Sequence, residues 1–380
     1  MRAGDVFALL RDGQPRTRAQ LVEVTGLARS TVAARVDVLM RLGLVAPYGD
    51  AVSTGGRPPS LLALNPSARL VAGVDLGATH ARAGLADLTG TVIAETRADL
   101  DIAAGPDHVL GWVADAISAL LAEQGRPGAD LAAIGIGLPG PVEHSTGRAI
   151  NPPIMPGWDA YDVPAHVQRR FRVPVLIDND VNIMALGERH THLPEVADLV
   201  LIKVSTGIGA GIISGGELQR GAQGTAGDVG HIRVSRADGV LCRCGNEGCL
   251  EAVAGLPALA ATLGCAVPDV VARVRGGDLD AVQVVRQAGR DLGEVVAMIV
   301  NFVNPGVVVV GGSTALAGEQ LIAGIREVVY SRSLPLATEH LRIVPSAAGE
   351  RSGILGAAAM AIAHVLSPEA IERASLELTG

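Results

Sequence analysis

The chain has 380 residues, enough for two or three domains of roughly 100–200 residues each. Apolar residues make up 48% and charged residues 18%, which excludes a disordered protein, and 2% aromatic residues are too few for a protein that stacks single-stranded bases on rings. No uncharged apolar run reaches the roughly 18 residues of a membrane span, and the N-terminus lacks an apolar signal segment. We therefore expect a soluble, cytoplasmic protein without membrane contact.

The net charge of −8 is divided unevenly along the chain. Residues 1–66 carry eight Arg and five acidic residues, a net charge of +3, whereas the remainder carries a net charge of −11. This division indicates a small anion-binding head on a larger domain that does not bind nucleic acid. Lys203 is the only lysine beside 30 Arg, a bias typical of GC-rich codon usage, so the arginine content by itself says little about function.

The basic module has the pattern of a helix-turn-helix. After a short amphipathic helix, a capping box at Thr17 opens a helix that runs to Val24, and Thr25-Gly26 forms a tight turn. The next helix covers about 28–42, with apolar residues at helical spacing. Its exposed start carries side chains that reach phosphates and base edges in a major groove, so we expect DNA contacts from Arg29, Ser30, Thr31 and Arg35.

Two apolar runs, 44–48 and 61–64, flank a polar stretch rich in glycine and proline. They predict a β-hairpin wing with a long tip. Arg57 lies on this tip, where an extended segment can enter a minor groove that favours a lone arginine. The alternative is that the stretch is a linker and Arg57 a solvated charge.

The body begins with strand patterns at 70–75, 81–87 and 91–97, joined by glycine turns. A second passage, 199–214, repeats the layout of strand, Gly/Thr turn, strand and Gly turn. The repetition indicates a weak internal duplication and thus two α/β lobes. Backbone N–H groups in such turns can hold phosphate, although ordinary glycine-rich hairpins have the same pattern.

An acidic segment, Asp178-Asn179-Asp180, follows the apolar strand 173–177 and opens a helix that runs to about His190. Acidic groups at the carboxyl end of a strand lie where α/β sheets bind ligands. An Asp there could take the proton of a sugar hydroxyl that attacks a phosphoryl group. Helix capping explains either Asp equally well.

Three of the four cysteines fall within eight residues. Cytoplasmic cysteines clustered in this way are more often metal ligands than disulfides. With a nearby histidine they form a Cys₃His set suited to tetrahedral structural Zn²⁺, namely His231, Cys242, Cys244 and Cys249. The fourth cysteine, Cys265, lies in an apolar helical context and is expected in the core.

The order of several blocks resembles the ROK family (repressors, open reading frames and sugar kinases), specifically its DNA-binding repressor branch. The blocks are the wing segment 53–62, the turn Asp75-x-Gly-x-Thr79, residues 135–142, Asp178-Asn179-Asp180, residues 224–231 with the cysteine cluster and Glu251, and residues 304–312. They cover essentially the whole chain. The resemblance implies an α/β fold, the two-lobed actin-like (ribonuclease H-like) sugar-kinase fold, preceded by a winged helix-turn-helix.

The resemblance also implies a division of the chain into parts. We expect the winged helix-turn-helix over 1–66, a first α/β lobe over 67–184 and a second lobe with the zinc-binding loop over 185–358. A C-terminal helix within 359–380 is expected to return to the first lobe.

The resemblance further implies a sugar in the cleft and, in kinase members, a nucleotide beside it. Asp180 corresponds to the base of those kinases, and Zn²⁺ would order the loop that presents His231 to the sugar. The implied sugar-binding residues are Gly140, Asn179, Asp180, Asp228, His231 and Glu251. The remnants of the nucleotide loops are Asp75, Gly77, Thr79, Thr206, Gly207, Gly311 and Gly312.

The sequence departs from the kinase pattern in both parts of this site. Ala78, His80 and Ser313 alter the nucleotide turns, and a Cβ at a glycine position blocks close approach of a phosphate to the backbone. Ile154 stands in place of a pocket Asn, and Asp228 is one methylene shorter than the family's Glu. Asp180, which phosphoryl transfer requires, is retained.

These features together favour a sugar-responsive transcriptional regulator, a repressor, that binds double-stranded operator DNA and a sugar or sugar derivative as effector. We expect it to act as a homodimer or a dimer of dimers, with one structural Zn²⁺ per chain. The alternative is an ATP- and Mg²⁺-dependent sugar kinase with a regulatory DNA-binding head, in which Asp180 would be catalytic.

Overall fold

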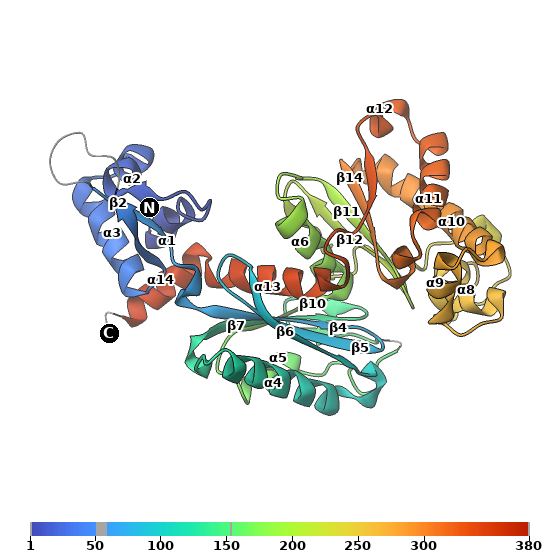
Figure 1. The fold of residues 1–380 in the computed structure, drawn as a ribbon, viewed down its shortest axis with the longest axis horizontal. Coiled ribbons are helices and arrows are strands. Elements are labelled where there is room, and N and C mark those ends of the chain that lie inside the picture. The colour runs from blue at the N-terminus through green and yellow to red at the C-terminus, as the bar shows by residue number, and fades with distance from the viewer. Residues whose placement is uncertain (1, 51–58, 153, 379–380) are drawn as a thin grey trace.

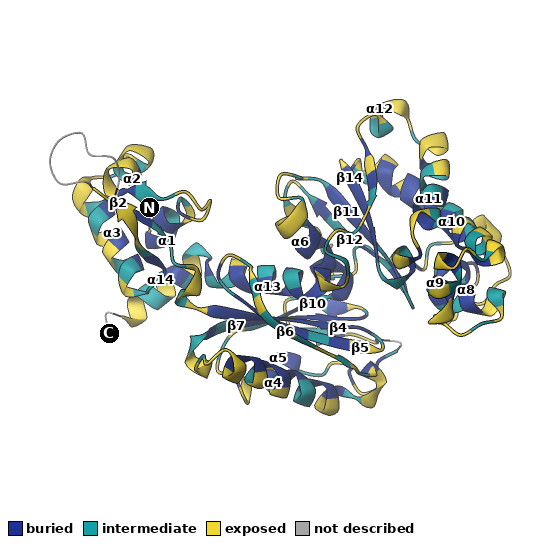
Figure 2. Cartoon of the chain, in the orientation of Figure 1, coloured by how far each residue is buried: buried dark blue, intermediate teal, exposed yellow. Residues whose placement is uncertain are grey.

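The computed structural model describes residues 2–50, 59–152 and 154–378. Figure 1 shows a small N-terminal head beside two α/β lobes. Buried residues are concentrated in the sheets of the lobes and on the inward faces of the helices that cover them (Figure 2).

The head is a winged helix-turn-helix, as predicted. Its capping box is present, because Thr17 Oγ1 accepts from the Gln20 N–H at 3.2 Å and Gln20 Oε1 accepts from the Thr17 N–H at 2.8 Å. Gly26 then ends the helix in the left-handed conformation, with φ at 67°. The elements are α1 (Ala3–Ala8), β1 (Arg16–Thr17), α2 (Arg18–Thr25), α3 (Arg29–Arg41), β2 (Val45–Asp50) and β3 (Ser60–Leu64), with β3 paired to both β1 and β2.

The first lobe is a five-stranded sheet between two helical layers. Helices α4 (Pro106–Glu123) and α5 (Val163–Gln168) lie on one face and α13 (Ser352–Val365) on the other (Figure 1). Gly73 and Gly135 allow α13 to lie this close, since a Cβ at either position would overlap a backbone carbonyl oxygen of the helix. The strands are β4 (Leu70–Leu76), β5 (His80–Ala86), β6 (Val92–Asp99), β7 (Leu131–Leu138) and β10 (Val175–Asn179), and a small hairpin of β8 (Val142–Glu143) and β9 (Arg148–Ala149) follows β7.

The second lobe is built around another five-stranded sheet, whose central strand β11 (Leu199–Val204) is buried on both faces. Successive side chains of a strand point to opposite faces. Leu199 and Leu201 pack with α6 (Asp180–His192), whereas Val200 and Ile202 belong to the core that includes α10 (Leu279–Val303). The other elements are β12 (Ile208–Ser214), β13 (Glu217–Leu218), β14 (Val307–Gly311), β15 (Arg342–Pro345), α7 (Glu251–Ala254), α8 (Leu256–Leu263), α9 (Asp269–Arg275), α11 (Glu319–Arg332) and α12 (Pro335–Thr338).

The two sheets share one topology. The strand orders are β6-β5-β4-β7-β10 in the first lobe and β13-β12-β11-β14-β15 in the second. Counted along the chain within each lobe, both orders are third, second, first, fourth and fifth. The first three strands of each lobe pair antiparallel, and the first, fourth and fifth pair parallel. This shared topology supports the internal duplication that the repeated turn layout indicates.

The lobes meet where α6 crosses α13. Both helices carry a glycine at the crossing, and a Cβ on Gly187 or Gly356 would overlap a carbonyl oxygen of the opposite helix. Helix α6 also packs against the second-lobe strands β11 and β12, whereas α13 packs against β4 and β7 of the first lobe. The crossing therefore places two backbones in direct contact between the lobes.

The last helix, α14 (Pro368–Glu377), lies against α1 of the head. Ile371 of α14 is 1% exposed and shares one buried cluster with head residues such as Phe7 and Leu39. Residues 359–377 thus divide between the end of α13 on the first lobe and α14 on the head.

Among the described residues, no single helix is long and apolar enough to cross a membrane. The bent pair 349–365 and 368–377 meets the length and composition criteria only when its two helices are taken together. Most residues of α13, which forms the first half of this pair, are buried between the sheet and α6.

Candidate functional site

The predicted acidic segment lies at the junction of β10 and α6. Asn179 caps α6, since its Oδ1 accepts from the Val181 N–H at 2.9 Å, and its Nδ2 donates to the Gly140 carbonyl at 2.9 Å. The capping role that the sequence left to either Asp therefore belongs to the Asn between them. Asp178 and Asp180 remain for other contacts, and both are at most 4% exposed.

Each of these two carboxylates is paired with a cation from the second lobe. Asp178 accepts from Arg220 Nε at 2.7 Å and from Asn182 Nδ2 at 2.8 Å, and His144 lies 3.5 Å away. Asp180 Oδ2 accepts from the ammonium of Lys203 on β11. Because these cations come from the second lobe, they tie it to the end of the first-lobe strand β10 and the start of α6.

Burial and charge act in opposite directions on the Asp180–Lys203 pair. Burial raises the pKa of Asp180 above its usual value, and the Lys203 ammonium only partly offsets this. Burial lowers the pKa of Lys203, but the Asp180 and Asp75 carboxylates together outweigh burial and leave that pKa raised. Asp75, at the end of β4, contributes to both shifts and so lies within electrostatic range of the pair.

The remaining predicted sugar-binding residues come from the second lobe. Glu251, at the start of α7, accepts from the Ile208 N–H at 3.1 Å, and its other oxygen lies 3.4 Å from Arg243 Nη2. Asp228 is exposed and lies 4.0 Å from His231 Nε2. Asp228 and Glu251 are thus further acceptors, in addition to those at the junction of β10 and α6.

Protein groups occupy the three turns that resemble nucleotide loops. At the first turn, the His80 ring packs directly on Gly77, and its Nε2 lies 3.6 Å from Asp75 Oδ2, while Thr79 is exposed. A Cβ at Gly77 would overlap this ring, so the ring takes the space through which a phosphate would approach the backbone. The sequence pointed to the Cβ of Ala78 as the obstacle, whereas the structure adds the imidazole.

Protein side chains also form hydrogen bonds at the other two turns. Arg243 Nη2 donates to the Thr206 carbonyl at 3.2 Å, beside Gly207. Ser313 Oγ lies 2.7 Å from Ser205 Oγ and follows Gly311-Gly312, where Gly312 has φ at 86°. A Cβ at Gly312 would lie 2.5 Å from the Val204 carbonyl oxygen, which requires glycine here independently of any nucleotide.

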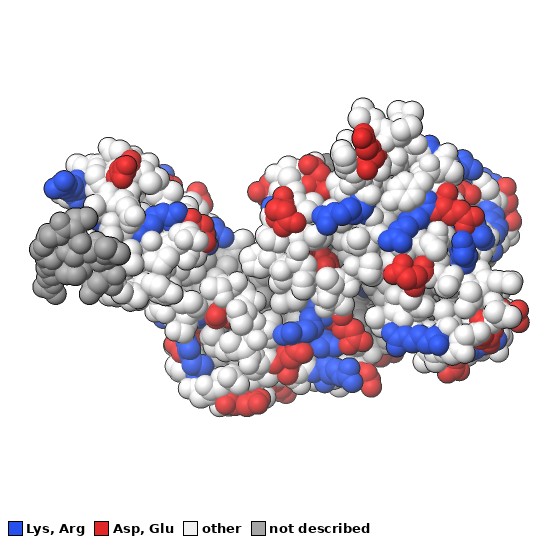
Figure 3. All heavy atoms as spheres, turned by 45° about the horizontal axis from the view of Figure 1, so that its top comes forward, with Lys and Arg blue, Asp and Glu red and all other residues white. Residues whose placement is uncertain are grey.

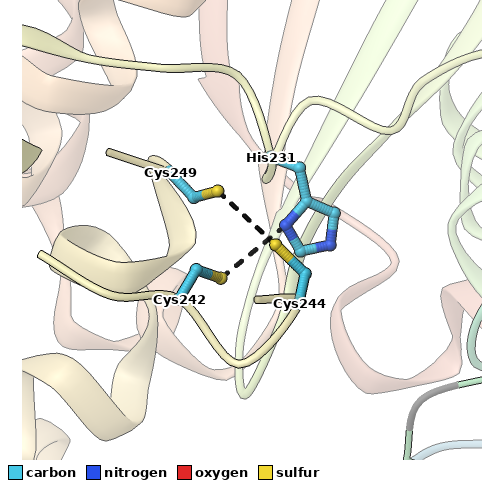
Figure 4. Close-up of side chains that lie close together, drawn as sticks. All are labelled: His231, Cys242, Cys244 and Cys249. Carbon is cyan, nitrogen blue, oxygen red and sulfur yellow. Dashed lines mark hydrogen bonds between the residues drawn. The ribbon is translucent and has the colours of Figure 1, made fainter. Parts of the chain in front are cut away.

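The four predicted metal ligands converge in one loop (Figure 4). One ligand atom from each of His231, Cys242, Cys244 and Cys249 lies within 4.8 Å of all the others. The Cys244 and Cys249 sulfurs are 3.7 Å apart, and His231 Nδ1 lies 3.8 Å from the Cys242 sulfur. Two thiolates each about 2.3 Å from a tetrahedral Zn²⁺ would be separated by about 3.8 Å, so the donor set fits this ion.

The backbone of the metal loop is shaped by two glycines with positive φ, Gly245 at 91° and Gly248 at 90°. A hydrogen bond from the Asn246 backbone lowers the pKa of Cys244, whereas burial raises the pKa of Cys249 to about 12. All four cysteines are free thiols. Cys265 follows α8 rather than lying within it, and packs partly buried against the second-lobe core.

The predicted DNA-contacting residues lie at the start of α3. Arg29 and Ser30 are exposed, whereas Thr31 and Arg35 are half-buried. The Nε atom of Arg35 is buried and has no hydrogen-bond partner among the described residues. Arg57 lies outside the described residues.

The charge distribution separates the head from the body. On the face shown in Figure 3, acidic and basic side chains alternate over the two lobes without forming one large patch of a single sign. The head differs from the body in its net charge, since residues 1–66 carry +3 and the remainder of the chain carries −11. A duplex would therefore be attracted to the head rather than to this face of the body.

The sequence did not indicate the cations that occupy the cleft. Lys203, Arg220 and Arg243 each bind a carboxylate or a turn of the site. Arg243 lies inside the cysteine cluster, but the cluster was interpreted through its metal ligands alone, and the other two belong to no motif. The one available signal was that Lys203 is the only lysine of the chain, in an otherwise apolar strand.

Comparison with known proteins identifies the family to which the chain belongs. The ROK family model matches residues 71–364, and the helix-turn-helix domain of the IclR type matches residues 1–47. The chain belongs to the ROK family. The xylose repressor of Caldicellulosiruptor bescii is 31% identical to this ROK chain, with 95% of each covered.

Two solved structures show how the ROK fold is shared. A ROK family transcriptional regulator, a homologue of the E. coli MLC protein, superposes with a TM-score of 0.84 at 26% identity, and 99% of this chain and 98% of that one are covered. A ROK glucokinase from Streptomyces griseus, in complex with glucose and AMPPNP, superposes with a TM-score of 0.67 at 28% identity, and covers 77% of this chain and 99% of its own. The predicted family, the fold and the class of sugar-responsive transcriptional repressor are thereby confirmed, within a family that also contains sugar kinases.

Proposed function

We propose that this ROK chain is a repressor whose head binds operator DNA and whose cleft binds a sugar without phosphorylating it. The observation that carries the proposal is the state of the three phosphate turns, which are covered by the His80 ring, the Arg243 guanidinium and the Ser205–Ser313 hydrogen bond. Phosphoryl transfer depends on positioning a nucleotide in line with its acceptor. With these contacts at the turns, the protein keeps the residues that bind a sugar but no longer positions a nucleotide for transfer.

A sugar can be held in this cleft without nucleotide. Asn179, Asp180, Asp228 and Glu251 supply acceptors, and hydrogen bonds to charged acceptors are about twice as strong as neutral ones. Sugar binding would change the relative position of the lobes, which meet at the α6–α13 crossing. Helix α14 follows α13 directly and packs on α1, so the same chain segment leads from the cleft to the head.

Zinc would serve this function structurally. Coordination by His231, Cys242, Cys244 and Cys249 would fix the loop that carries Arg243 and leads into Glu251. The bound ion supplies a rigid tetrahedral crosslink, and the loop residues present the sugar acceptors.

The proposed assembly is a homodimer, or a dimer of dimers, that reads two half-sites of a pseudo-palindrome. Helix-turn-helix heads reach such sites in pairs. The end of α10 and the segment after α11 expose large apolar side chains, including Phe302 at 88% and Leu336 at 86%, which supports burial against a second copy.

The experiment is a search for operator fragments with the full-length protein, followed by fluorescence anisotropy with and without sugars. We expect specific duplex binding that is abolished by deletion of residues 1–66. At least one sugar among D-xylose, D-glucose and N-acetyl-D-glucosamine should change the affinity at least fivefold. Operator binding that survives loss of the head would overturn the proposal.

A further inference from the structure

The Lys203–Asp180 pair is the most completely buried ion pair of the cleft. The Lys203 side chain is 18% exposed, that of Asp180 is 5% exposed, and the neighbouring Asp75 side chain is 11% exposed. A charged group in such a place is stable only when it is paired, because burial removes most of its hydration. The pair is therefore a fixed feature of the site and not a mobile surface contact.

The three residues come from three different elements. Asp75 ends β4 of the first lobe, Asp180 begins the crossing helix α6, and Lys203 lies on the central strand β11 of the second lobe. The position of Asp75 is further constrained by α13, since a Cβ on Gly353 would overlap its carboxylate. The Lys203 ammonium thus binds the Asp180 carboxylate where the lobes converge, and the Asp75 carboxylate acts electrostatically on the same pair.

Proteins usually bind Mg²⁺ through one or two carboxylates. The ion keeps several water ligands and also binds the phosphates of the substrate. The Lys203 ammonium, which is bound to Asp180, neutralises one of the two charges. It also repels any divalent cation that approaches, because like charges in a water-poor cleft interact strongly. A hydroxyl group carries no net charge and is not repelled in this way.

We propose that Lys203 is a specificity-determining residue that replaces the divalent cation of the cleft, so that the site accepts a neutral sugar and rejects a metal–nucleotide complex. The inference rests on the proposed function, since it explains how a kinase-like cleft acts as a sugar sensor. Lys203 also occupies a lone pair of Asp180, the group that a kinase would use to take the hydroxyl proton. Asp180 then serves as a hydrogen-bond acceptor only.

The test is a Mn²⁺ titration of the full-length, zinc-loaded protein, followed by the electron paramagnetic resonance signal of free Mn²⁺. Lys203→Met should gain one Mn²⁺ site per chain that binds at least tenfold more tightly than any cleft site of the wild type. Lys203→Arg, which keeps the charge, should behave like the wild type. Adding Asp180→Asn to Lys203→Met should remove the new site, which locates it in the cleft.

A second neutral substitution keeps the test decisive where Lys203→Met does not fold. Lys203→Gln removes the charge and keeps a side-chain N–H group that can donate to Asp180. It should gain the Mn²⁺ site, whereas Lys203→Arg should not, and circular dichroism verifies that each variant is folded.

Equal Mn²⁺ binding by the wild type and by folded Lys203→Met or Lys203→Gln would overturn the proposal, as would a site gained equally by Lys203→Arg. This readout needs neither DNA nor sugar. A sugar response of operator binding that persists alongside such a result would remove the role of Lys203 and leave the repressor function intact. If the operator binding of the wild-type protein responds to none of the sugars, the proposed sugar-sensing function is wrong, whatever the Mn²⁺ titration shows.

Discussion

Ile371 provides the sharpest test of how the head is held on the body. Its side chain is 1% exposed in the cluster that α14 shares with the head, and α14 packs on α1 so closely that a Cβ on Gly4 would lie 2.5 Å from Pro368 Cα. Replacing a buried Ile by Ala removes apolar contacts and leaves a cavity, at a cost of about 2–5 kcal/mol. Ile371→Ala should therefore weaken the head by about that amount.

The two tryptophans make the assay selective. Trp112 lies on α4 and Trp158 is buried in the first-lobe core, so tryptophan fluorescence reports on the first lobe. Hydrogen exchange of peptides from α1 to α3 reports on the head. In Ile371→Ala, exchange in the head should speed up about 30-fold or more, while the urea midpoint from tryptophan fluorescence stays unchanged.

The matched control is Arg373→Ala, which removes an exposed side chain from the same helix. It should leave exchange in the head at the wild-type rate. Head amides that exchange equally slowly in Ile371→Ala and in the wild type would refute the idea that α14 completes the core of the head.

Three further predictions concern the metal, the DNA and the ion pair. Cys244→Ser should lower zinc below one ion per chain in elemental analysis, and a full zinc content would contradict the Cys₃His site. Arg29→Ala should weaken operator binding by about 1–3 kcal/mol in anisotropy titrations if Arg29 reads a base. Arg41→Ala, at the far end of the same helix, should have little effect, and equal losses would argue against reading by the start of α3. Lys203→Met should lower the free energy of unfolding in urea by about 3–5 kcal/mol, because it leaves a buried charge unpaired. Adding Asp180→Asn to the same chain should restore part of this free energy. If the losses of the two single variants simply add up in the double variant, the two side chains are not coupled.

Much of the fold followed from local patterns in the sequence. The Thr17 capping box and the Gly26 turn fix α2 because both act through neighbouring backbone groups, and the structure contains both. The repeated layout of strands and turns indicated two lobes, because the antiparallel strands that begin each lobe are also neighbours along the chain. The three cysteine ligands, which fall within eight residues, were also readable, because a short loop brings them together by itself.

Contacts between distant segments were not readable in the same way. Lys203 reaches Asp180 across the lobe junction, and neither an apolar strand nor an acidic segment specifies the other as its partner. The resemblance implies a C-terminal helix, but the surface that α14 covers depends on where α13 leaves it. The His80 ring covers Gly77 because β5 begins with its side chain turned over the preceding turn, a rotamer that sequence alone does not determine.

The most direct test of the account combines sugar response and phosphoryl transfer in one sample. Operator-bound protein is titrated with D-xylose, D-glucose or N-acetyl-D-glucosamine, with and without ATP and Mg²⁺, while DNA anisotropy and ADP formation are followed together. The account predicts that one of these sugars changes operator affinity at least fivefold without ATP and that ADP does not accumulate above the sugar-free background. A DNA response that appears only with ATP, or steady sugar-dependent ADP formation that Asp180→Asn abolishes, would contradict it.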